Sequence, residues 1–204
     1  LGVPAIFFLG GIYAPGDDAH RHTLDSISAC ADLARDLGLP DPPVIATGFG
    51  GKSEDWANVR PRLIEQLRDF GEMAEREDFV LAGEAHSGGA VNSTERVIEV
   101  LEPVGNPRVR LHFDIVHFFI GGEEIEECVP RLVPWTAHTH VTDAVRHPDK
   151  RFDPRLPGDG ELDTVAYVRA MDEAGWDSFI TLEISGMIWG AEGYDVGDAA
   201  RQCY

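Results

Sequence analysis

The sequence has few lysines and no long apolar segment, and both absences exclude classes of function. Only Lys52 and Lys150 are lysines among 17 basic residues, against 36 acidic residues, so the formal net charge is −19. Proteins that bind the nucleic-acid backbone need clustered lysine and arginine, so we expect no nucleic-acid partner. No apolar run approaches the roughly 20 residues that cross a bilayer, so we expect no membrane partner either.

Cysteines are also scarce: Cys30, Cys128 and Cys203 are scattered and show no C-x-x-C spacing. This usage predicts reduced thiols in the cytoplasm and favours neither disulfides nor a cysteine zinc site. A chain of 204 residues with 43% hydrophobic residues is long enough for one sizeable core. We therefore predict a single domain over residues 1–204.

Short β-rich segments alternate with longer segments of helical period, which indicates a parallel sheet with helices outside it. Helices are expected from Thr23 to about Gly38, and over about 53–76, 92–102, 123–129 and 163–174. The six expected strands are Pro4–Leu9, Val44–Thr47, Phe79–Glu84, Val109–Asp114, Trp135–Val141 and Ser178–Glu183.

Six such β/α units are fewer than a closed eight-stranded barrel contains, which usually needs about 250 residues. The pattern favours a (β/α)8 TIM barrel that is incomplete at both termini. Two units would be missing before the first strand, and part of the last helix after the end. An open doubly wound sheet is the less favoured alternative, because no glycine-rich phosphate loop follows any strand.

Four consecutive strands end on a side chain that can bind a metal: Glu84, Asp114, His140 and Glu183. In a parallel barrel all carboxyl ends of strands meet at one face, so these groups are expected to converge. One acidic residue at a strand end is usually a helix cap or a solvated residue, but three buried carboxylates together need a cation. The set predicts one divalent ion, with Mn²⁺, Mg²⁺ or Co²⁺ favoured and Zn²⁺ as a further option.

Five short motifs follow the strands in order. Together they resemble the xylose-isomerase-like TIM-barrel family of sugar phosphate isomerases and epimerases. Thr142 stands where lysine is common in the H-V-K-D signature. The motifs are Glu84-Ala-His86, Asp114-Ile-Val-His117, His140-Val-Thr-Asp143, Gly158-Asp-Gly-Glu-Leu-Asp163 and Thr181-Leu-Glu183.

The resemblance implies that Glu84, Asp114, His140 and Glu183 hold the metal. Glu84 and Glu183 would serve as base and acid in a proton transfer through an enediolate, whose charge the ion stabilises.

The resemblance also implies substrate-binding residues. His117 and Arg146 match the positions at which the ketose 3-epimerase branch contacts substrate oxygens, and His86 is expected to line the pocket. That branch has a second glutamate where this chain has Ala90, which departs from the epimerase pattern.

The leading functional hypothesis is a divalent-metal-dependent isomerase or epimerase of carbohydrate metabolism. Its substrate would be a small sugar or polyol, and self-association is left open. The alternative is a dehydratase of the inosose or dehydroshikimate type, in which the enolate expels a β-hydroxyl group. A non-catalytic sugar-binding barrel is a third hypothesis. An apurinic endonuclease is disfavoured by the charge of −19.

Overall fold

The structure is a computed structural model that describes residues 3–147 and 151–203. Its contacts divide the chain into two compact units. The first unit comprises the residues up to Phe113 together with Trp135–His138, and the second comprises Asp114–Pro134 and the residues from Thr139 onward. That the whole chain folds as one domain stays a prediction.

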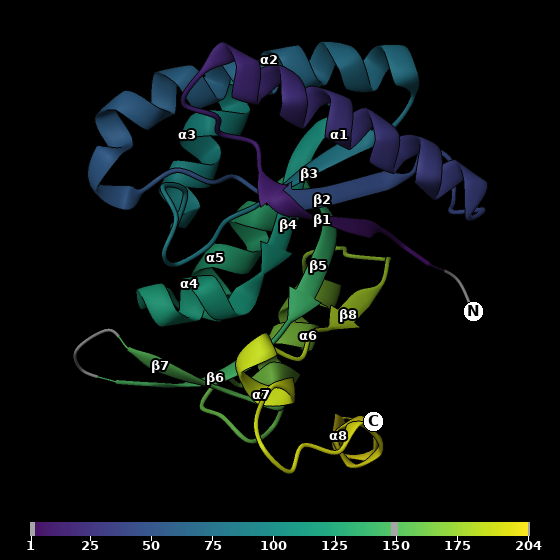
Figure 1. Cartoon of the computed structure of the whole chain (residues 1–204). Helices are drawn as coiled ribbons and strands as arrows, with labels where there is room; N and C mark the ends of the chain where they lie inside the picture. Colours follow the sequence, from purple (N-terminus) through teal and green to yellow (C-terminus); the bar gives the residue numbers. More distant parts are fainter. Residues whose placement is uncertain (1–2, 148–150, 204) are drawn as a thin grey trace. The chain divides into compact units, whose positions relative to one another are not determined.

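The first unit is a parallel sheet with helices packed along it (Figure 1). Helix α1 packs on β1 and β2, and α2 packs on β3. Helix α2 is held by an apolar stripe at helical spacing, in which Leu63, Leu67 and Phe70 are fully buried. The helices are α1 (Asp17–Asp36), η1 (Ser53–Asp55), α2 (Trp56–Glu77) and α3 (Thr94–Val104). The strands lie in the order β1 (Ile6–Gly11), β2 (Val44–Gly48), β3 (Val80–Glu84), β4 (Val109–Asp114) and the start of β5 (Thr136–Val141).

In the second unit, the end of β5 pairs in parallel with β8, so that His140 lies beside Thr181. An antiparallel hairpin of β6 and β7 branches off directly after β5. The elements are α4 (Ile115–Gly121), α5 (Ile125–Leu132), η2 (Val133–Trp135), β6 (Asp143–Arg146), β7 (Phe152–Arg155), α6 (Thr164–Glu173), β8 (Ile180–Leu182), α7 (Gly186–Trp189) and α8 (Val196–Cys203).

All six predicted strands are present, each with bounds within about two residues of the expected ones. Helix α1 begins at Asp17, six residues before the predicted start, because Asp17 and Asp18 suit the first turn of a helix. Helix α4 was not predicted. No strand was predicted between Val141 and the helix that begins at about residue 163, but this segment contains the β6–β7 hairpin, of which residues 148–150 lie outside the described part. Among the described residues, no helix is both long and apolar enough to cross a membrane.

Candidate metal centre and active site

Three of the four predicted ligands come together in the second unit. Asp114 is the last residue of β4, His140 lies near the end of β5, and Glu183 directly follows β8. One potential ligand atom of each lies within 4.8 Å of the others. The closest pair is His140 Nδ1 and Glu183 Oε2, at 3.1 Å. These three residues form the carboxylate–histidine cluster.

The electrostatics of this cluster favour a cation. Asp114 is 2% exposed. Its burial, followed by the charge of Glu183, raises the pKa of its carboxyl to about 7, against the opposing effect of His140. Two carboxylates and one imidazole are hard and borderline donors of the kind that Mn²⁺, Mg²⁺ and Zn²⁺ accept. The donor set therefore fits a divalent ion, which would relieve the repulsion between the two acids.

Asp114 also has an ordinary structural role. Its Oδ1 atom accepts a hydrogen bond of 3.2 Å from the backbone N–H of Val116 and so caps the start of α4. Its other oxygen, Oδ2, lies 3.3 Å from the hydroxyl of Thr142. Asp114 can therefore cap the helix through one oxygen while its other oxygen lies beside Thr142.

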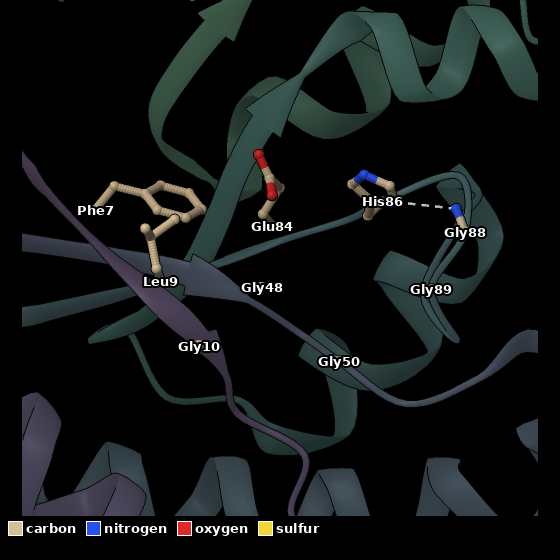
Figure 2. A pocket seen from close by; sticks show the side chains of 9 residues that line it. All are labelled: Phe7, Leu9, Gly10, Gly48, Gly50, Glu84, His86, Gly88 and Gly89. Carbon is tan, nitrogen blue, oxygen red and sulfur yellow. Dashed lines mark hydrogen bonds between the residues drawn. The ribbon is translucent and has the colours of Figure 1, made fainter. Parts of the chain in front are cut away.

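The fourth predicted ligand, Glu84, lies in the first unit at the end of β3. It borders a cavity of about 400 Å³, and Figure 2 shows it on the same side of the sheet as Phe7 and Leu9 of β1. Its Oε1 atom is 3.8 Å from Nε2 of the buried His112. Glycines supply most of the remaining lining: Gly10, Gly48, Gly50, Gly88 and Gly89.

His86 borders the same cavity, from the loop that follows β3. Its side chain is exposed, and its Nδ1 accepts a hydrogen bond of 3.0 Å from the N–H of Gly88 (Figure 2). This bond fixes the ring at the rim of the cavity. That Glu84 binds metal and that His86 binds substrate stay predictions.

The other two predicted substrate-binding residues lie in the second unit. His117 of α4 is buried, and its Nε2 is 3.9 Å from Oδ2 of Asp114, so it lies against the cluster. The guanidinium group of Arg146 instead donates to the carbonyl of Phe119 at 3.1 Å and lies 4.0 Å above the ring of that residue. Arg146 is thus held against α4, and its contact with a substrate stays a prediction.

The sequence predicted no role for Asp143, yet its fully buried carboxylate ties the start of β6 to the segment that follows β7. A Cβ atom on Gly160 would come within 2.1 Å of Oδ1 of Asp143, so only glycine fits there. The H-V-T-D and G-D-G motifs contain these residues and are the sequence signal for this contact. We call this arrangement the Asp143 clasp. It accepts four backbone hydrogen bonds of 2.7–3.0 Å, from Ala144, Gly158, Gly160 and Leu162.

A family model described as xylose isomerase-like TIM barrel matches residues 3–201. The chain belongs to this family. The predicted barrel class is thereby confirmed, and the structure of the probable 3-DHS dehydratase AsbF from Bacillus anthracis supports it. The AsbF structure matches with a TM-score of 0.81 at 18% identity. The match covers 99% of this chain and 74% of the AsbF chain.

An inosose dehydratase from Clostridium perfringens is 21% identical to this chain over 183 residues. The match covers 80% of this chain but only 60% of that relative. A crystal structure of the IolI protein with a bound zinc atom has a TM-score of 0.73 at 18% identity, covering 88% of this chain and 66% of that one. Epimerase structures also match, but at 16% and 17% identity they show the fold alone.

These comparisons correct one prediction. The sequence was expected to encode an isomerase, and this enzyme class is wrong, because the curated relatives that the chain matches include inosose dehydratases. The methyl group of Ala90 is fully buried at the position where the epimerase branch has a glutamate. The cluster predicted from the strand ends suits either chemistry, since both begin with removal of a proton next to a carbonyl group.

Proposed function

We propose that the protein is a divalent-metal-dependent dehydratase, a lyase that removes water from a small cyclic ketone bearing several hydroxyl groups. The observation that carries this proposal is the carboxylate–histidine cluster of the second unit. The dehydratase relatives supply the reaction class, and their names point to inosose or dehydroshikimate as substrates to test.

The reaction would eliminate one water molecule. A base removes the proton from the carbon between the carbonyl carbon and the carbon that carries the leaving hydroxyl. The electrons of that C–H bond form a C=C bond while the C–O bond breaks, and the hydroxyl takes up a proton and leaves as water. A divalent ion, when bound, would polarise the ketone oxygen and offset the charge that develops on it.

The chain's own residues would divide these tasks. Asp114, His140 and Glu183 would hold the ion, with Glu84 as the predicted fourth ligand. Glu183 is half-exposed, which suits a carboxylate that also exchanges a proton with the substrate, and Glu84 is the second proposed proton-transfer group. His117, Arg146 and His86 would orient the substrate's oxygens. The short distances between Asp114, His140 and Glu183 support their proposed roles. The roles of the other residues are supported by the family resemblance.

A spectroscopic assay with the full-length protein tests the proposal. The protein is stripped of metal with a chelator and then supplied separately with Mn²⁺, Mg²⁺, Co²⁺ or Zn²⁺, in the presence of inosose or dehydroshikimate. Dehydration produces a conjugated chromophore, so we expect ultraviolet absorbance to rise with at least one ion and to stay flat without metal. Folded protein that binds metal but produces no chromophore from either substrate would overturn the dehydratase assignment.

A further inference from the structure

We propose that Thr142 is a positioning residue of the metal centre, whose single hydroxyl group sets the orientation of both carboxylates in the cluster. The inference rests on the proposed function, because it concerns how the same cluster receives its ion. It assigns a role to a residue that the family resemblance marks only as a departure from lysine.

The hydroxyl of Thr142 lies between the two acids. Thr142 is the residue between β5 and β6 and is 6% exposed. Its Oγ1 is 3.3 Å from Oδ2 of Asp114 and 3.5 Å from Oε2 of Glu183. A hydroxyl group has one proton to donate, so the two carboxylates share a single donor. The side chain therefore couples the directions in which both carboxylates point.

The same oxygen of Glu183 also faces His140. Nδ1 of His140 is 3.1 Å from Oε2, so the imidazole and the hydroxyl group converge on one carboxylate oxygen. These contacts restrict rotation of the Glu183 carboxylate, whose side chain is otherwise 43% exposed. A partly exposed ligand gains most from such a restraint, because the free side chain would sample several rotamers.

A threonine provides this restraint without adding charge. An ammonium group at this position would offset part of the negative charge on Asp114 and Glu183, whereas a neutral hydroxyl leaves that charge available to a cation. Partners that hydrogen-bond to metal ligands typically change metal affinity by about 10–100-fold when they are removed.

The backbone beside Thr142 is also fixed. The next residue is Asp143, whose carboxylate in the Asp143 clasp accepts one hydrogen bond from a backbone N–H of β6 and three from the segment that follows β7. The clasp anchors the chain immediately after Thr142, and β5 anchors it immediately before. The backbone is therefore held on both sides of the residue that carries the hydroxyl.

Zinc affinity of full-length variants tests this role. T142V keeps the shape of the side chain and removes the hydroxyl, while T142S keeps the hydroxyl. We expect T142V to raise the Kd for Zn²⁺, measured by competition with a chromogenic chelator, at least about 10-fold. We expect T142S to stay within about twofold of the wild-type protein, and the melting temperature of the metal-free protein to be similar in all three. If T142V does not fold, T142A takes its place.

Two results would overturn the inference, and they differ from failure of the proposed function. Equal Zn²⁺ affinity in T142V and wild type would show that the hydroxyl does not position the ligands. Equal loss in T142V and T142S would assign the effect to packing. If the wild-type protein itself binds no Zn²⁺, the proposed metal centre is wrong, and the role of Thr142 that depends on it is wrong as well.

Discussion

The predicted acidic ligands of the two units lie in different surroundings. In the first unit Glu84 borders a cavity lined largely by glycines, and its Oε1 atom lies 3.8 Å from Nε2 of His112. In the second unit Asp114 is buried beside Glu183, and the pKa of its carboxyl is raised for that reason. Close packing of like charges therefore marks a cation site more strongly than does a strand-end carboxylate alone.

The largest expected effect comes from neutralising Glu183, because its carboxylate is proposed both to hold the ion and to transfer a proton. We expect E183Q to lower the dehydration rate by about 10²–10⁴-fold, the usual contribution of a positioned acid or base, in the chromophore assay. E192Q makes the same chemical change at an exposed position of the same unit and should leave the rate unchanged. Full activity in E183Q would remove Glu183 from the chemistry.

A second, smaller effect tests whether the first unit contributes a ligand. Because loss of a ligand should exceed loss of a ligand's hydrogen-bond partner, we expect E84Q to weaken Zn²⁺ binding by more than about 10-fold. The measurement is the chelator competition used for Thr142. Wild-type affinity in E84Q would confine the metal centre to the second unit and would contradict the prediction of a fourth ligand.

The third effect is on stability and concerns only the second unit. In D143N an amide nitrogen replaces one acceptor oxygen of the Asp143 clasp, so backbone N–H groups lose their partner. We expect the free energy of unfolding in urea to fall by about 1.5–3 kcal/mol, the size of a hydrogen bond to a charged group. D172N, at an exposed position of α6, should change it by less than about 0.5 kcal/mol. An unchanged midpoint in D143N would show that the clasp does not stabilise the fold.

Much of the fold was predictable, because strands and helices have different hydrophobic periods. The alternation gave six strands, and the fact that parallel strands end at one edge pointed to Asp114, His140 and Glu183. Helix α4 was missed because its seven residues are too few to show a period and include three aromatic or histidine side chains in a row (His117, Phe118 and Phe119).

Other features depend on contacts that no local pattern reveals. The partners of Asp143 are backbone groups as many as 19 residues away, and the hydroxyl of Thr142 acts on side chains 28 and 41 residues away. Arg146 was predicted to bind substrate, but in this structure its guanidinium group lies on Phe119. The predicted reaction class was wrong, and the reason is chemical. Isomerases and dehydratases can share one ligand set, because both stabilise the anion formed next to a carbonyl group.

The most direct measurement is the position of the ion itself, from anomalous X-ray scattering of crystals of the full-length protein loaded with Zn²⁺. We expect one strong peak at about 2.0–2.2 Å from an oxygen of Asp114, a nitrogen of His140 and an oxygen of Glu183. A zinc peak at other residues, or none in crystals of protein that binds zinc in solution, would contradict this prediction.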